Sequence, residues 1–176
     1  MRTVERDDLE FLHRGNNHPS IARFLSGTPS IMPTIASDLE QQVNTDTVRL
    51  LVVPREGEFG DEPVGLVYMY VDDTRTMGLG GVWLLPEAQR QKFTQDALIH
   101  FIEYAFGPYG LHRIEVRTSE QNRVIQRLCD RWGFSHEGVI REREFRDGEY
   151  TDLERYGLLV HEWPGKEPLL DNVFNG

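Results

Sequence analysis

The sequence predicts one domain of the α/β (α+β) class, with a mixed, mostly antiparallel central sheet flanked by helices. Two observations support this class. Runs rich in β-branched and aromatic residues alternate with segments whose apolar residues recur every three or four positions, and the last two extended runs are joined by a glycine turn. The 176 residues are 39% hydrophobic and 27% charged, which suits one soluble domain with its own core. We expect that domain to span residues 1–163, followed by a C-terminal tail over 164–176.

The first part of the chain is predicted to be mainly helical. A short helix is expected over Arg6–Leu12, with an aspartate near its N-cap, and it should break at residues 15–17, where glycine and asparagine interrupt the pattern. A second short helix is expected around residues 20–25. The spacing of apolar residues from Ile35 onward predicts a third helix that ends near Asn44.

Three strands are expected next, over residues 48–53, 64–71 and 77–85. The third contains Gly78, Gly80 and Gly81. Glycine weakens a strand interior, so its presence there usually marks a bulge or a close approach to the backbone. This strand is therefore a candidate for contact with a ligand.

The rest of the chain is predicted to form a long helix, a strand, a last helix and a hairpin, over residues 91–106, 111–118, 122–132, and 134–145 with 149–160. In the long helix, Phe93, Ala97 and Phe101 recur at steps of four residues. Gly148 supplies the positive φ that the hairpin turn needs.

The tail is expected to fray, as chain ends commonly do. Its apolar residues also suit docking on this subunit or on a second copy, which makes a homodimer a further expectation; they are Leu169, Leu170, Val173 and Phe174.

The charge and cysteine content exclude several classes of function. With 29 acidic and 19 basic residues the net charge is −10, which opposes nucleic acid or an anionic membrane as the general partner and favours cationic substrates, although solubility alone would also explain it. One cysteine forms no internal disulfide, and no Cys/His spacing suits zinc, so we expect no metal and a cytoplasmic location. No apolar leader or membrane span is apparent, so no membrane anchor is expected.

Spaced motifs in the C-terminal half point to a family. They are the runs Trp132–Arg141, Asp147–Asp152 and Tyr156–Leu158, which follow an asparagine at position 122. This pattern resembles the GNAT N-acetyltransferase superfamily, and within it most resembles the branch of ribosomal-protein N-terminal acetyltransferases; the match covers about residues 3–163. The resemblance implies a GNAT-like sheet with a splayed strand pair and a C-terminal hairpin. It also implies direct transfer of an acetyl group from acetyl-CoA to a primary amine, either a protein N-terminus or a small cationic amine, in a ternary complex.

The resemblance places acetyl-CoA between the strand over 77–85 and the strand over 111–118. Backbone N–H groups near Val82 and Leu84 would polarise the thioester carbonyl. In the family, a loop of the form Gln/Arg-x-x-Gly-x-Gly/Ala then binds the pyrophosphate at the start of the long helix. The corresponding window here reads Gln89, Arg90, Gln91, Lys92, Phe93 and Thr94.

This loop departs from the family pattern, because Lys92 and Thr94 stand where the family has small residues. Three interpretations are open. In the first, the cofactor still binds, and charged contacts from Arg90 and Lys92 replace some of the N–H contacts. In the second, cofactor binding is weakened. In the third, cofactor binding is lost; the rival function is then a non-catalytic acyl-CoA sensor or protein-binding module. In a further alternative the long helix begins at Pro86, which would make both cations ordinary surface residues.

Three residues in the second half of the chain are further site candidates. Asn122 is the family-equivalent asparagine that reaches the cofactor, or it is a plain N-cap. Cys129 stands where many members have a tyrosine that protonates the CoA thiolate, but a small buried hydrophobe is the simpler interpretation. Glu115 and Glu137 are candidates for the general base. Because Glu115 lies between Arg113 and Arg117, a solvated cross-strand charge is the simpler explanation of this residue.

Overall fold

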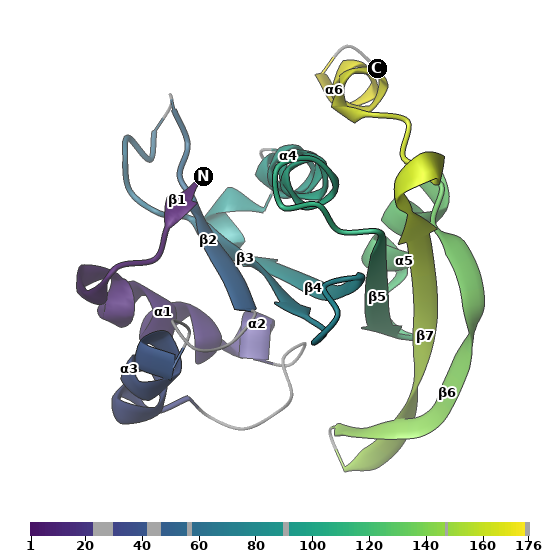
Figure 1. The fold of residues 1–176 in the computed structure, drawn as a ribbon. Helices are drawn as coiled ribbons and strands as arrows, with labels where there is room; N and C mark the ends of the chain where they lie inside the picture. The colour runs from purple at the N-terminus through teal and green to yellow at the C-terminus, as the bar shows by residue number, and fades with distance from the viewer. Residues whose placement is uncertain (23–29, 42–46, 56–57, 90–91, 147, 175–176) are drawn as a thin grey trace. The chain divides into compact units, whose positions relative to one another are not determined.

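The computed structural model describes residues 1–22, 30–41, 47–55, 58–89, 92–146 and 148–174 (Figure 1). Within these ranges the strands are β1 (Arg2–Thr3), β2 (Thr47–Val52), β3 (Gly65–Val71), β4 (Met77–Leu84), β5 (Arg113–Ser119), β6 (Ser135–Arg146) and β7 (Glu149–Leu159). The helices are α1 (Leu9–Asn16), α2 (Pro19–Ala22), α3 (Met32–Gln41), α4 (Phe93–Phe106), α5 (Arg123–Arg131) and α6 (Lys166–Phe174). Short 3₁₀ turns are η1 (Arg6–Asp8), η3 (Pro86–Ala88) and η4 (Val160–Glu162).

The described strands form one sheet in the order β1-β2-β3-β4-β5-β7-β6. The ladder between β4 and β5 is parallel, whereas β1–β2, β2–β3, β5–β7 and β6–β7 are antiparallel. The predicted class, a mixed and mostly antiparallel sheet with helices, is therefore confirmed. The chain divides into two compact units: unit 1 comprises Met1–Tyr70 with Gly81–Leu98, and unit 2 comprises Val71–Gly80 with Ile99–Gly176. In the described ranges, every helix is too short or too polar to span a lipid bilayer.

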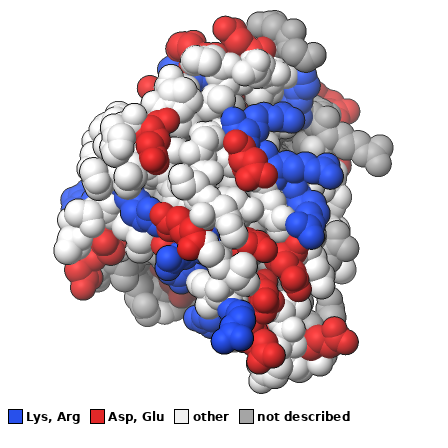
Figure 2. Space-filling model, turned by 90° about the vertical axis from the view of Figure 1, so that its right-hand side faces the viewer, with Lys and Arg blue, Asp and Glu red and all other residues white. Residues whose placement is uncertain are grey.

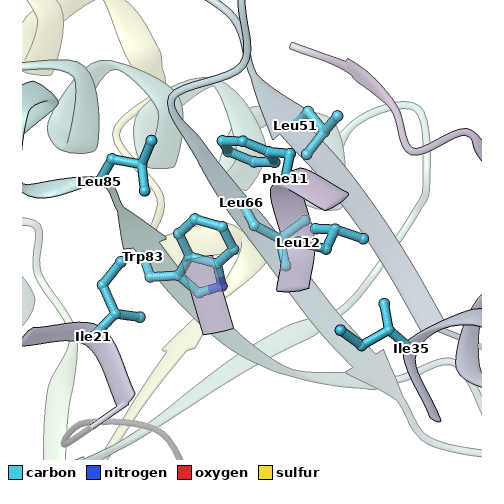
Figure 3. Close-up of a cluster of buried hydrophobic side chains, with 8 residues drawn as sticks. All are labelled: Phe11, Leu12, Ile21, Ile35, Leu51, Leu66, Trp83 and Leu85. Carbon is cyan, nitrogen blue, oxygen red and sulfur yellow. The ribbon is translucent and has the colours of Figure 1, made fainter. Parts of the chain in front are cut away.

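Unit 1 is organised around an apolar cluster between the first helices and the strands (Figure 3). Leu51 and Leu66 lie opposite each other on β2 and β3, so their side chains share one face of the sheet. Helices α1, α2 and α3 cover this face and complete the cluster, whose members are Phe11, Leu12, Ile21, Ile35, Leu51, Leu66, Trp83 and Leu85.

The predicted break at residues 15–17 is confirmed, because α1 ends at Asn16 and Asn17 is its C-cap. Gly15 itself still lies inside the helix. Gly15 is explained by packing instead of by a turn. A Cβ atom at this position would lie 2.1 Å from Cη2 of Trp83, so only glycine lets the helix pass this close to the indole. Phe11, one turn earlier on the helix, contacts the same indole with its ring centroid 5.5 Å away.

Unit 2 is built on β5, β7 and β6. Seven residue pairs join β5 to β7, from Arg113 opposite Leu159 to Ser119 opposite Leu153. Strands β6 and β7 form the predicted hairpin, and Gly148 in its turn has φ +89°. Basic and acidic side chains are interspersed over the face that looks out from β6 and β7 (Figures 1 and 2).

The C-terminal tail forms a helix, so the expected fraying of this segment is wrong. In α6, Leu169 and Val173 are each 6% exposed and lie one helical turn apart, which gives the helix a buried side. Pro168 is tolerated because it lies in the first turn, where the missing N–H has no helical partner. Just before this helix, the indole N–H of Trp163 donates to Glu103 Oε2 on α4 at 2.8 Å.

Candidate functional site

Strand β4, the candidate for cofactor binding, begins in unit 2, continues from Gly81 in unit 1 and is followed there by η3 and α4. The parallel ladder of β4 with β5 covers Met77–Leu79, and β4 then continues to Leu84. Val82 on this segment is half-buried, and the side chain of Leu84 is buried. A functional role for Leu84 would therefore fall to its backbone N–H and not to its side chain. Gln89 stabilises the turn after the strand, because its Nε2 donates to the Leu84 carbonyl at 3.0 Å.

The loop before α4 keeps the backbone conformation that favours glycine, although a lysine occupies it. Lys92 has φ +62°, in the left-handed region that non-glycine residues rarely adopt. That conformation costs an L-residue about 1–2 kcal/mol. Arg90 and Gln91, which the sequence analysis also assigned to this loop, lie outside the described residues.

The long helix begins immediately after Lys92. The Lys92 carbonyl accepts hydrogen bonds from the backbone N–H groups of Gln95 and Asp96, both at 3.1 Å, so Lys92 occupies the N-cap position. The alternative in which this helix begins at Pro86 is therefore wrong: η3 ends at Ala88, and α4 starts at Phe93. Helix geometry leaves the N–H groups of Phe93 and Thr94 without partners inside α4, as anion binding at a helix start requires.

These features fit the pyrophosphate of acetyl-CoA. Lys92 has a backbone conformation that favours glycine, and its side chain is exposed. Thr94, which is half-buried, follows in the first turn of the helix. The loop therefore favours the interpretation in which charge supplements the N–H groups over the one in which the cofactor site has been lost.

Unit 1 also holds two buried polar atoms that the sequence analysis did not identify. Among the described residues, Arg49 Nη1 and Gln95 Oε1 are the buried side-chain nitrogen and oxygen atoms without a hydrogen-bond partner. Neither residue belongs to a recognisable motif, so the sequence alone carried no signal for them. Buried polar atoms without a hydrogen-bond partner are rare in folded proteins, so each of them needs a structural or functional explanation.

In unit 2, Asn122 has the geometry of an N-cap. Its Oδ1 accepts from the Ile125 N–H at 3.4 Å. The turn before α5 is further held by the buried Gln126, whose Nε2 donates to the carbonyls of Ser119 and Glu120 at 3.2 and 2.8 Å. The capping role of Asn122 is thus visible, and its contact with a cofactor stays a prediction.

Cys129 on α5 is buried, with 3% of its surface exposed. Burial, and to a lesser extent the charge of Asp130, raises the pKa of the Cys129 thiol to about 12. A thiol with so high a pKa is a weak proton donor to a CoA thiolate of ordinary thiol basicity. The position therefore favours the interpretation of Cys129 as a small buried hydrophobe.

Glu115 is not the solvated charge that the sequence analysis expected: it is only 4% exposed. Its carboxylate accepts from Arg117 Nε at 2.6 Å and is 3.5 Å from Arg113 Nη2. Arg113 in turn makes two hydrogen bonds to Glu137, at 2.7 and 2.5 Å. Gly157 leaves room for this pair, because a Cβ there would lie 2.4 Å from both Arg113 Nη1 and Glu137 Oε1.

The arginine–glutamate network of unit 2 comprises Arg113, Glu115, Arg117, Glu137 and Arg155. The hydrogen bonds from Arg113 hold the pKa of Glu137 below its usual value. A carboxylate held in this way is a poor base. Both candidates for the general base are therefore engaged by arginines.

The predicted site residues thus fall into two groups. Unit 1 contains Val82, Leu84, Gln89, Lys92, Phe93 and Thr94, and unit 2 contains Glu115, Asn122 and Cys129. The unit 1 group is continuous along the chain and has the features of a cofactor-binding strand and loop. In the unit 2 group, each side chain has a structural role within its own unit.

Comparison with known proteins agrees with this geometry. A family model described as an acetyltransferase (GNAT) domain matches residues 1–135. The spermidine N(1)-acetyltransferase of Escherichia coli K12 is 24% identical over 93% of this chain and 87% of its own length, and an uncharacterized N-acetyltransferase, p20, of Bacillus licheniformis is 24% identical over 94% of both. The crystal structure of Vibrio cholerae spermidine N-acetyltransferase in complex with CoA and spermine shares the fold, with a TM-score of 0.83 at 23% identity, covering 92% of this chain and 95% of that one. The chain therefore belongs to the GNAT acetyltransferase family and is an acetyl-CoA-dependent N-acetyltransferase.

Proposed function

We propose that this protein transfers the acetyl group of acetyl-CoA to the primary amine of a small molecule. The observation that carries the proposal is the φ of +62° at Lys92 immediately before α4, a backbone conformation that favours glycine, the residue that the family pattern has at this position. Acetyl-CoA supplies the acyl group as an activated thioester. The other reactant is the free amine.

The choice of a small amine over a protein N-terminus is supported by the relatives that match most of the chain. Those from Escherichia coli and Vibrio cholerae are named spermidine N(1)-acetyltransferases, and they align with 93% and 90% of this chain. A relative named a putative ribosomal N-acetyltransferase, from Bacillus subtilis, aligns with 49% of it. The narrower resemblance to the ribosomal-protein branch stays a prediction.

In the proposed site, the chain contributes binding and orientation. Phe93 and Thr94 would donate backbone N–H groups to the pyrophosphate, with the Lys92 ammonium beside them. The backbone N–H groups near Val82 and Leu84 would stabilise the negative charge that develops on the thioester oxygen. No side chain is assigned as the acid or the base, because Cys129, Glu115 and Glu137 are each better explained by packing or ion pairing.

The test is a turnover assay with a panel of acceptors, followed by mass spectrometry of the products. The panel contains spermidine, putrescine, simple alkylamines, amino acids, and peptides beginning with Ser or Ala. We expect CoA release and a mass increase of one acetyl group on at least one small amine. Acetylation of the peptides alone would contradict the small-molecule part of the proposal, and binding of acetyl-CoA without any turnover would contradict catalysis.

A further inference from the structure

Two tyrosines and an arginine form a polar cluster at the end of the apolar core of unit 1. Arg49 on β2 lies directly opposite Tyr68 on β3. Each of the two is two residues along its strand from the core pair Leu51 and Leu66, so their side chains share the core face of the sheet. The rings of Tyr68 and Tyr70 meet edge to face at 5.6 Å, and the Arg49 guanidinium lies 5.8 Å from the centroid of the Tyr70 ring. We call these three residues the Arg49 cluster.

The Arg49 cluster contacts the strand that is proposed to bind acetyl-CoA. A Cβ atom at Gly81 would lie 2.6 Å from both the Cζ and the hydroxyl oxygen of Tyr68. The phenol end of Tyr68 therefore occupies the space that glycine leaves on β4. This contact explains one of the glycines in that strand, and the next residue along the chain is Val82, whose N–H is proposed to face the thioester.

Arg49 is the member of this cluster without a full set of partners. Its Nη1 is buried and has no hydrogen-bond partner among the described residues. The guanidinium spreads its positive charge over its nitrogens, so this buried nitrogen is a charged donor without an acceptor among the described residues. Among the described residues, the charged or titratable groups that act on the pKa of the neighbouring Tyr68 are Tyr70 and Arg49 itself. Burial raises the pKa of Tyr68, which therefore stays a neutral hydroxyl able to donate.

We propose that the Arg49 cluster binds a carboxylate of the acceptor, so that the substrate is a small amine carrying a carboxylate and not a polyamine. This inference rests on the proposed function, because it identifies the acceptor for the same site. The Arg49 guanidinium and the Tyr68 hydroxyl would donate to the carboxylate oxygens, a pairing for which arginine is well suited. Tyr70, 48% exposed, is the ring that would move to admit the carboxylate.

The cluster also argues against a cationic tail on the acceptor. A second ammonium placed beside Arg49 would meet a like charge in a poorly solvated region, which is unfavourable. The overall charge of −10 does not reverse this local preference. Salt screens distant surface charges beyond a Debye length of about 8 Å, whereas the half-buried Arg49 guanidinium would act at contact distance.

The experiment compares three amines of equal chain length with wild-type protein and with Arg49→Met. The amines are γ-aminobutyrate, butylamine and putrescine, which differ only in carrying an anionic, a neutral or a cationic end; an α-amino acid series tests shorter separations. We expect the carboxylate-bearing amines to have the highest kcat/KM. Arg49→Met should raise their KM by on the order of tenfold or more, with little change for butylamine. Tyr68→Phe should weaken the same substrates less.

Two outcomes would overturn the inference while leaving the proposed function intact. One is that putrescine and spermidine are acetylated faster than every amino acid; the other is that Arg49→Met lowers activity equally for all three end groups. A binding measurement keeps the test independent of turnover. Titration calorimetry with γ-aminobutyrate should give heat with wild-type protein and none with Arg49→Met, whose circular dichroism and melting temperature report on folding. No binding of any carboxylate-bearing amine by the folded wild type would also overturn it.

Discussion

The arginines on the strands of the two units have different partners. In unit 2, Arg113 and Arg117 are neutralised by Glu115 and Glu137 at distances as short as 2.5 Å. In unit 1, Arg49 lies beside tyrosine rings, and its Nη1 has no partner among the described residues. In unit 2 the described residues thus supply the anions that pair with arginine. In unit 1 the Arg49 Nη1 has no acceptor among the described residues, so an anion from outside is a suitable partner for it.

The comparison also explains why charge sits so close to the sheet in unit 2. Gly157 opposite Glu115 leaves space for the Arg113–Glu137 pair, so the network is built into the β5–β7 ladder. A buried ion pair gives little net stability compared with an apolar replacement, but removing one partner is costly because the other charge is left unpaired. The two units should therefore respond in opposite ways when one charge is removed.

The largest expected effect is the loss of stability on Glu115→Ala. This change leaves Arg117 without its carboxylate and should lower the free energy of unfolding by about 2 kcal/mol, less than for a fully buried pair because Arg117 is partly exposed. Arg49→Met, the matched change in unit 1, should leave that free energy unchanged or raise it slightly. Urea denaturation of both variants measures the difference. Similar losses in the two variants would remove the distinction between the units.

The next effect concerns the Lys92 loop. If this loop binds pyrophosphate, Lys92→Glu should weaken acetyl-CoA binding by on the order of tenfold, about 1.4 kcal/mol, by replacing an attraction with a repulsion. Lys92→Gly is the control: it relieves the positive φ and should raise stability by roughly 0.5–1 kcal/mol, while weakening binding less than glutamate does. Equal affinities for all three proteins in calorimetry would exclude this loop from the cofactor site.

Cys129 gives a smaller and mainly kinetic effect. Because burial raises the pKa of the thiol to about 12, alkylation by iodoacetamide at pH 8 should be at least about a hundredfold slower in the native protein than in urea. Cys129→Ala should keep kcat within about threefold, as expected for a packing residue. A much larger fall in kcat, with the fold intact by circular dichroism, would restore the acid role that the family position suggested.

The smallest effect is a change in the acid sensitivity of the fold. Hydrogen bonds from Arg2, at 2.7 Å, lower the pKa of Asp8 in unit 1, and those from Arg113 lower that of Glu137 in unit 2. A lowered folded-state pKa gives stability that is complete above the unfolded value, near 4, and is lost as the pH falls through the folded value. Asp8→Asn and Glu137→Gln should each flatten the stability profile below about pH 4. A wild-type slope in either variant would show that its ion pair contributes nothing.

Much of the fold could be predicted because its signals are local. The strand runs, the long helix and the Gly148 hairpin turn all follow from spacing and turn chemistry. The features that the sequence did not reveal depend on tertiary packing. The contact of Gly15 with Trp83 is invisible in the sequence, and the burial of Leu169 and Val173, which makes the C-terminal tail helical instead of frayed, depends on their surroundings.

The candidate site was predicted less completely than the fold. The family pattern identified the loop but not the left-handed backbone at Lys92, a conformation that lysine rarely adopts. Burial of Glu115 and Cys129 followed from packing, which spacing does not determine. Arg49 had no signal at all, because a single arginine in a strand reveals a missing partner only once its neighbours are known.

The most direct test of the account is a calorimetric titration of the purified protein with acetyl-CoA. We expect a dissociation constant in the micromolar range and one site per chain, because Lys92 combines a left-handed backbone with a cation immediately before the start of α4. An absence of binding up to about 1 mM acetyl-CoA would contradict the central claim that this chain is a working acetyltransferase.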